Sequence, residues 1–301
     1  MCLKIFKLET FATNPGDRSS SAMPPGNSYM TLFSNRMTSR NYMINENQKS
    51  FANQIYANYD EALSVCNGLG YSVKELTDVV VKKNIAMKKS LTEDQFLGSD
   101  STRTLMSVGF ALNARSVRVL DFGGGGGYHY TLARHALGNE CKIKWHVVET
   151  ESMCQSGQAM ADESLKFFSS ISAAQKDLGN VDLLLTSSAL QYCPDPIRYL
   201  QELLAVSAKY IYITRTPFFP GHQTLVSVQS SMLSQNGPGP LPPGYTDQEI
   251  LYPISFVPIE QVESLIQEKY IIRFKVLEQP ANLFIENQPV NAYYGFFCEL
   301  K

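Results

Sequence analysis

The pattern of hydrophobic and polar positions changes character near residue 117. Between residues 51 and 113 apolar side chains recur at helical spacing, and Ser72 and Glu75 have the spacing of an N-terminal capping box. The apolar stripe that follows the box consists of Leu76, Val79, Val80 and Ile85. No segment before residue 114 alternates as a strand does, so the pattern predicts a helical extension over residues 51–113.

After residue 117, short apolar runs alternate with amphipathic segments, which is typical of βαβ units. The predicted strands are residues 117–120, 143–148, 165–168, 181–185, 210–213, 271–277 and 292–300. The predicted helices are residues 128–137, 151–162, 196–207 and 259–268. The last two strands lie too close for a helical crossover. We therefore expect an α/β fold: a Rossmann-like seven-stranded, mostly parallel sheet with an antiparallel last strand.

Two segments depart from these patterns. Residues 1–50 are rich in Ser, Asn, Thr, Pro and Gly, which favours a flexible tail or an arm that closes over a ligand. Residues 216–258 interrupt the alternation and contain a Pro- and Gly-rich run at 236–244. Long insertions of this kind are often lids, although some are only loops. The expected organisation is a segment 1–50, an extension 51–113, and a domain 114–301 with a lid insertion at 216–258.

Composition narrows the function classes. The chain has 301 residues, of which 44% are hydrophobic, and its net charge is −2. Without a basic excess we expect no nucleic-acid partner, and without a run of about 18 apolar residues we expect no membrane partner. The scattered cysteines and the lack of a signal-like N-terminus favour a cytoplasmic location. The histidines form no metal-ligand pattern, and nothing predicts the oligomeric state.

The strongest chemical signal is the glycine run that follows the first predicted strand. Asp121, Gly123, Gly125 and Gly127 have the spacing Asp-x-Gly-x-Gly-x-Gly. Glycines let backbone N–H groups approach a ligand that a Cβ would exclude, and the helix that starts at Tyr128 offers unpaired N–H groups. The dinucleotide spacing of Gly at i, i+2 and i+5 is not met from any glycine of the run. A glycine-rich turn without a ligand is the alternative.

An acidic residue ends the second predicted strand. Glu149 lies 22 residues after Gly127, where a carboxylate can accept hydrogen bonds from both ribose hydroxyls of a nucleoside. The alternative is a solvated strand-end glutamate. Further residues are expected near the cofactor: Met153 at the adenine or in the helix core, Ser169 and Ser170 at the adenine, and Ser188 near the reactive methyl.

Three residues are candidates for the acceptor side. Tyr192 follows the fourth strand, and its alternative is a core tyrosine with a paired hydroxyl. Arg215 follows the fifth strand and could clamp a carboxylate or phosphate, or form a structural ion pair. His222 is the histidine of the insertion and a candidate general base, with a surface loop histidine as the alternative.

With these residues the chain resembles class I S-adenosylmethionine-dependent methyltransferases, and more closely a largely uncharacterised family of bacterial methyltransferases. The resemblance covers about residues 55–301. It rests on Asn58–Ala62 with Gly70-Tyr71, Leu120–Gly124, Val148-Glu149, Ala189–Tyr192 with Asp195-Pro196, and Arg215-Thr216-Pro217. Where the family usually has Asp before the Arg-Thr-Pro sequence, this chain has Thr214.

The resemblance implies S-adenosylmethionine as the cofactor and methyl transfer as the reaction. We expect a small-molecule acceptor and consider an anionic or sugar-type metabolite first. Methyl transfer is an in-line displacement, so alignment of the reactants can supply much of the catalysis. Two alternatives remain: a non-catalytic module that binds S-adenosylmethionine, and aminopropyl transfer. No acidic cluster follows the fourth strand to receive a polyamine.

Overall fold

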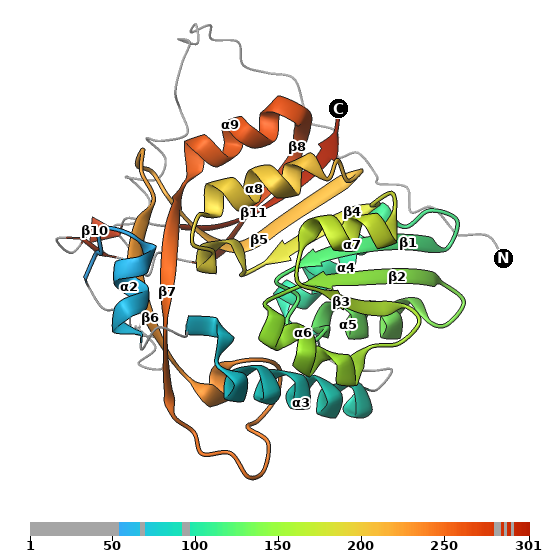
Figure 1. Ribbon diagram of the computed structural model, residues 1–301. Coiled ribbons are helices and arrows are strands. Elements are labelled where there is room, and N and C mark those ends of the chain that lie inside the picture. Colours follow the sequence, from blue (N-terminus) through green and yellow to red (C-terminus); the bar gives the residue numbers. More distant parts are fainter. Residues whose placement is uncertain (1–53, 67–69, 92–96, 280–283, 286–287, 290–291) are drawn as a thin grey trace, which may run out of the picture. The chain divides into compact units, whose positions relative to one another are not determined.

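Seven hydrogen-bonded strands form one path through the computed structural model of the protein, in the order β3-β2-β1-β4-β5-β11-β8 (Figure 1). The strands are β1 (Ser116–Phe122), β2 (Lys142–Val148), β3 (Leu165–Phe168), β4 (Leu183–Ser187), β5 (Tyr210–Phe219), β8 (Tyr270–Gln279) and β11 (Ala292–Leu300). The first five pair in parallel, and β11 is antiparallel to both β5 and β8. This confirms the expected Rossmann-like fold and its antiparallel last strand.

The structure describes residues 54–66, 70–91, 97–279, 284–285, 288–289 and 292–301. The predicted arm at residues 1–50 lies outside these ranges and stays a prediction. Two short strands, β9 (Phe284–Ile285) and β10 (Gln288–Pro289), pair with each other in the connection between β8 and β11.

Helices cover both faces of the sheet because its central strands are apolar along their length; all five residues of β4 are buried. One face packs against α7 (Ile171–Leu178), α8 (Pro196–Ala205) and α9 (Ile259–Lys269). The other packs against α3 (Lys74–Ser90), α4 (Ser99–Ala111), α5 (Tyr128–Leu137) and α6 (Glu151–Gly157). Two helices of the predicted extension, α3 and α4, thus contribute to the core of the sheet.

Local boundaries differ from expectation at three places. The capping box at Ser72 does not form, because Ser72 ends the 3₁₀ turn η1 (Gly70–Ser72) and Val73 is the N-cap of α3 without a side-chain bond. Helix α6 ends at Gly157 instead of residue 162, and a 3₁₀ turn, η2 (Gln158–Met160), follows it. The structure also has α7, which the pattern did not predict.

The insertion is folded rather than a loop. Strand β5 continues to Phe219, and β6 (Leu225–Met232) and β7 (Glu249–Pro258) form an antiparallel hairpin whose base pairs in parallel with the end of β5. Most residues of β6 are buried, because one face of the strand packs against α2 (Tyr59–Val65). This burial of apolar side chains explains why the hairpin forms. The hairpin and α2 lie at the carboxyl edge of the sheet (Figure 1).

Candidate cofactor and acceptor site

A cavity of ≈ 910 Å³ opens where the carboxyl ends of β1, β2, β4 and β5 meet. Its size is at the upper end of the range of about 300–1,000 Å³ for small-molecule sites. The cavity brings together most of the predicted site residues: Gly123, Gly125, Tyr128, Glu149, Met153, Ser169, Ser170, Ser188, Tyr192 and Arg215. Three predicted residues are not part of its lining: Asp121, Gly127 and His222.

The turn between β1 and α5 requires glycine at several positions. Gly123 has φ +73°, and a Cβ there would lie 2.1 Å from the Cβ of Ala189. Gly125 has φ +55°, and Gly127, the N-cap of α5, has φ +84°. The backbone N–H of Gly123 donates to the carbonyl of Val148, at 2.9 Å. These contacts fix the conformation of the turn Gly123–Gly126, which lines the cavity. We call this turn the glycine cradle.

Glu149 connects the end of β2 to this cradle. Its Oε1 accepts a hydrogen bond from the N–H of Gly125 at 3.0 Å, and its Oε2 accepts one from the N–H of Thr150 at 2.9 Å. Burial raises the pKa of the Glu149 carboxyl, although both backbone donors act in the opposite direction. A carboxylate has about four acceptor positions, so Glu149 can still accept from ligand hydroxyls.

Asp121 does not face the cavity, which corrects its assignment as a direct cofactor contact. It is fully buried and accepts from Nε1 of Trp145 at 3.0 Å, and Nδ1 of His129 lies 3.1 Å from its Oδ2. A Cβ on Gly124 would lie 2.5 Å from Oδ2 of Asp121. Asp121 therefore supports the glycine cradle from below, and its partner His129 reaches the cavity lining.

Asn84 on α3 is a lining residue that the sequence did not single out. It is 1% exposed, and its Nδ2 donates to the carbonyl of Val80 at 2.9 Å. Because that bond fixes the orientation of the amide, Oδ1 is the free atom, and it has no hydrogen-bond partner among the described residues. A Cβ on Gly126 would lie 2.6 Å from Nδ2, so Asn84 packs directly on the cradle. No local pattern distinguishes it from a core-facing helix residue.

Three tyrosines of the lining, Tyr59, Tyr71 and Tyr192, form an aromatic wall of the cavity. The rings of Tyr71 and Tyr192 stack with centroids 5.3 Å apart. The hydroxyl of Tyr59 donates to the Tyr192 carbonyl at 3.1 Å, that of Tyr71 to Asn236 at 3.2 Å, and that of Tyr192 to Gln229 at 3.2 Å. Burial raises the pKa of Tyr59 to about 12 and also raises that of Tyr192. The wall therefore offers ring faces to a ligand, while its hydroxyls are protonated and paired.

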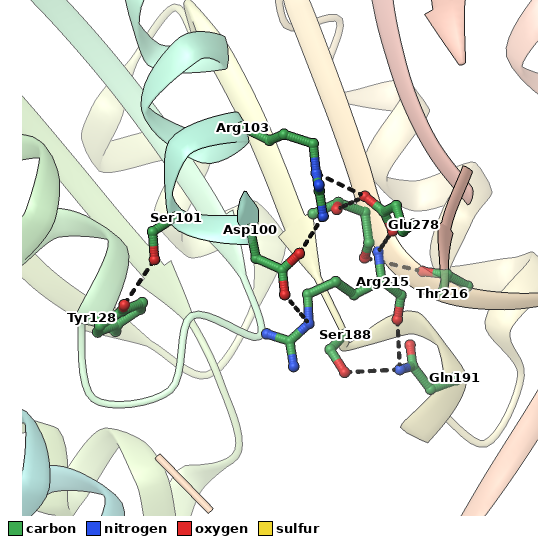
Figure 2. A network of polar contacts seen from close by, with 10 residues as sticks. Asp100, Ser101, Arg103, Tyr128, Ser188, Gln191, Arg215, Thr216 and Glu278 are labelled. Carbon is green, nitrogen blue, oxygen red and sulfur yellow. Dashed lines mark hydrogen bonds and ion pairs between the residues drawn. The ribbon is translucent and has the colours of Figure 1, made fainter. Parts of the chain in front are cut away.

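Of the two candidates Arg215 and His222, only Arg215 lines the cavity. Arg215 lines the cavity, and its Nε lies 3.6 Å from Oδ2 of Asp100 (Figure 2). His222 is exposed in the turn between β5 and β6. A general base must reach the proton that it removes, so this position gives His222 no support as the base.

The roof of the cavity is the stretch Gln235–Pro238 at the end of the hairpin. The buried Nζ of Lys83 on α3 donates to the carbonyls of Ser234 and Asn236, at 2.7 and 2.8 Å. Burial lowers the pKa of Lys83. Helix α3 thus contacts the cradle through Asn84 and holds the roof through Lys83.

Within the described ranges, no group of three or more His, Cys, Asp or Glu side chains could hold a metal ion. In the same ranges no helix is long and apolar enough to cross a bilayer.

The comparisons with known proteins gave no match in sequence and several in structure. No family model matches the chain, and no curated protein matches it in sequence. Among solved structures it is similar to an S-adenosylmethionine-dependent methyltransferase from Clostridium acetobutylicum ATCC 824, with 12% identity, 73% of this chain and 98% of that chain covered, and a TM-score of 0.44.

It is also similar to the [4+2]-cyclase SpnF, with 12% identity, 84% and 99% coverage, and a TM-score of 0.46. For magnesium protoporphyrin IX methyltransferase (ChlM) from Synechocystis PCC 6803 with bound S-adenosylmethionine, the identity is 12%, the coverage 75% and 97%, and the TM-score 0.40. At these identities the similarity concerns the fold alone.

Proposed function

We propose that the protein binds S-adenosylmethionine in this cavity and transfers its methyl group to a small molecule. The observation that carries the proposal is that a glycine cradle and a strand-end carboxylate, Glu149, line one cavity at the carboxyl edge of the sheet. The resemblance in sequence to class I methyltransferases supports the same function, and we place the chain with that bacterial family as part of the proposal.

The lining fits the chemical groups of this cofactor. Glu149 has acceptor positions left for the ribose hydroxyls. The free Oδ1 of Asn84 suits the ammonium of the methionine end, because a buried acceptor gains most from a charged donor. The N–H groups of Gly124 and Gly126, which donate to no described residue, suit the carboxylate beside it. On the far side, Met153, Ser169 and Ser170 would contact the adenine.

When bound, the sulfonium of the cofactor supplies an activated methyl group. The residues of the chain then have to orient the acceptor and exclude water, which strengthens electrostatic contacts inside the cavity. The stacked rings of Tyr71 and Tyr192 and the roof over them would do this. We propose that the acceptor lies on their side of the cavity and that it is a small metabolite of anionic or sugar type.

Titration calorimetry with S-adenosylhomocysteine tests the cofactor assignment. Glu149→Ala should weaken binding by about 1–3 kcal/mol, the scale of lost hydrogen bonds to a charged group. The matched control is Glu151→Ala, an exposed acid in the first turn of α6, which should leave the affinity unchanged. Wild-type protein that does not bind the ligand, or equal affinity in both variants, would overturn the assignment.

The reaction is tested by incubating the protein with S-adenosylmethionine carrying an isotopic label in its methyl group and with a metabolite extract. A labelled product of the mass expected for one added methyl supports methyl transfer. Cofactor binding without any labelled product favours the non-catalytic alternative. Aminopropyl transfer is tested in a second incubation with decarboxylated S-adenosylmethionine, in which a product heavier by one aminopropyl group would favour it.

A further inference from the structure

Two residues with left-handed backbone lie next to each other at the edge of the cavity. Ser188, just after β4, and Arg215, within β5, both have φ +57°. The N–H of Ser188 donates to the carbonyl of Thr214 at 3.0 Å, so the two strained positions are neighbours on adjacent strands. Both residues line the cavity. Strain of this kind in non-glycine residues persists only where the surroundings fix it, and it clusters at ligand sites.

Glu278 fixes the backbone of Arg215 from two strands away. The register between β5 and β11 shifts opposite Gly295, and Arg215 lies in that bulge. Glu278, on β8, reaches past Gly295, where a Cβ would lie 2.7 Å from its Oε1. Its carboxylate accepts from the Arg215 N–H at 2.5 Å (Figure 2). It also accepts from the Thr214 hydroxyl. The carboxyl side chain of Glu278 is fully buried.

Gln191 joins the two strained residues from the other side. Its Nε2 donates to Oγ of Ser188 at 2.9 Å and to the carbonyl of Arg215 at 3.0 Å. Because Oγ of Ser188 accepts in this bond, its hydroxyl proton is left to donate elsewhere. The Ser188 side chain also lies within hydrogen-bond reach of the Tyr192 hydroxyl, and Ser188 lines the cavity, so its hydroxyl is one of the polar groups that a bound ligand would meet.

The guanidinium of Arg215 also keeps donors for a ligand. Its Nε approaches Asp100 at 3.6 Å, and among the described residues its two terminal nitrogens donate no hydrogen bond. Asp100 is shared, since it also pairs with Arg103, and Arg103 in turn lies 3.5 Å from Glu278. The negative charges of Asp100 and Glu278 are therefore balanced by the positive charges of two arginines, Arg103 and Arg215. An arginine fork with free terminal nitrogens has the geometry that binds carboxylate or phosphate oxygens.

We propose that Ser188 and Arg215 form a subsite for an anionic oxygen group of the methyl acceptor, a carboxylate or a phosphate. Gln191 and Glu278 are positioning residues: they hold the strained backbone that turns the Ser188 hydroxyl and the Arg215 guanidinium toward one point of the cavity. The inference rests on the proposed function, because it assigns the subsite to the acceptor of that reaction.

The subsite is tested with small probes on the full chain saturated with S-adenosylhomocysteine, by ligand-detected NMR titration. Benzoate and phenyl phosphate are the anionic probes and benzamide is the neutral one; their ring suits the aromatic wall of Tyr71 and Tyr192. At least one anion should bind about tenfold more tightly than benzamide, and the anion that does so identifies carboxylate or phosphate. Arg215→Gln should abolish this preference, and Ser188→Ala should reduce it several-fold.

Matched controls separate the subsite from general damage. Arg198→Gln and Ser172→Ala change exposed residues outside the cavity and should keep the full preference. Arg215→Gly tolerates the left-handed backbone, so it should fold and bind S-adenosylhomocysteine yet lose the preference. For the positioning role, Glu278→Gln keeps an acceptor oxygen and should retain the preference that Glu278→Ala loses, with unchanged affinity for S-adenosylhomocysteine.

Equal binding of anionic and neutral probes to the wild type, no binding of either anion, or a preference that survives Arg215→Gln would overturn the inference. The failure of the proposed function shows separately, as a wild-type protein that does not bind S-adenosylhomocysteine in the first titration.

Discussion

The two sides of the cavity are built from different parts of the chain. The cofactor half, which we define as Gly123–Gly126, Glu149, Ser169 and Ser170, consists of backbone turns that directly follow β1, β2 and β3. The acceptor half, defined as Tyr59, Tyr71, Tyr192, Arg215 and Gln235–Pro238, consists of side chains and one turn brought together from α2, η1, η3 (Leu190–Tyr192), β5 and the hairpin.

The difference shows where each half gets its shape. In the cofactor half, positive φ angles and missing Cβ atoms define the surface, so a change of residue type there is costly. In the acceptor half, long-range hydrogen bonds define it, such as that of Tyr71 to Asn236, 165 residues away. The cofactor half can therefore keep its ligand while the acceptor half changes its side chains. The predictions below test this contrast.

The largest effect is expected for Gly123→Ala. A left-handed backbone costs about 1–2 kcal/mol for a residue with a Cβ, and the overlap with Ala189 adds about 1–3 kcal/mol. The free energy of unfolding should fall by the sum, and binding of S-adenosylhomocysteine should be lost. Gly239→Ala is the control: it has φ +75° and nothing within 4 Å of a Cβ, so only the backbone cost applies. Urea unfolding and calorimetry compare the two, and equal losses would contradict the contrast.

A smaller effect is expected from pH, through Glu149. Its pKa lies above the ordinary value of 4.5 because of burial, and ribose hydroxyls bind the ionised form. Affinity for S-adenosylhomocysteine should be constant above the raised pKa and fall by about tenfold per pH unit below it. The free protein changes in the opposite sense: the contribution of Glu149 to stability is full below pH 4.5 and is lost as pH rises through the raised pKa. Calorimetry from pH 4.5 upward checks the affinity, and Glu149→Gln should remove the dependence.

Asn84→Ala should have a moderate effect. It removes a buried acceptor that packs on the cofactor half, which we expect to weaken S-adenosylhomocysteine binding by about 1 kcal/mol, or roughly fivefold. Asn139→Ala, an exposed asparagine in the loop after α5, is the matched control. An unchanged affinity in the Asn84 variant, measured by calorimetry, would remove the methionine-end assignment without affecting that of Glu149.

The smallest effect is expected for His222→Ala. An exposed residue outside the cavity lining should change neither cofactor affinity nor stability by more than about 0.5 kcal/mol, and methyl transfer should continue at the wild-type rate. If the rate of label transfer collapsed while binding persisted, His222 would return as the general base and the acceptor half would have to include the turn between β5 and β6.

Much of the fold and of the cofactor half could be predicted because their signals are local. The glycine spacing lies within seven residues, and Glu149 follows directly on an apolar strand. The hairpin β6–β7 was missed because prolines and glycines flank its strands, and because β6 does not alternate: residues 226–229 are all buried.

The supporting residues had no local signal. In the sequence, Asn84 is one more position of an amphipathic helix. Its role is visible only in the structure, where its amide packs against Gly126. Glu278 acts on Arg215, 63 residues earlier, across an intervening strand. Thr214 is the position at which the sequence departs from the family that it resembles, and in the structure the Thr214 hydroxyl donates to that same Glu278 carboxylate. Contacts of this kind depend on strand order and register, which one sequence does not specify.

One turn of α3 touches both halves. Asn84 packs on the cradle, Lys83 holds the roof, and Val80 lies against Gly237, where a Cβ would be 3.3 Å from the Val80 Cα. In the proposed reaction, a displacement of this turn by one ligand would reach the binding surface of the other. Thermodynamic reciprocity requires that any factor by which the cofactor changes the affinity for the acceptor equal the factor by which the acceptor changes the affinity for the cofactor.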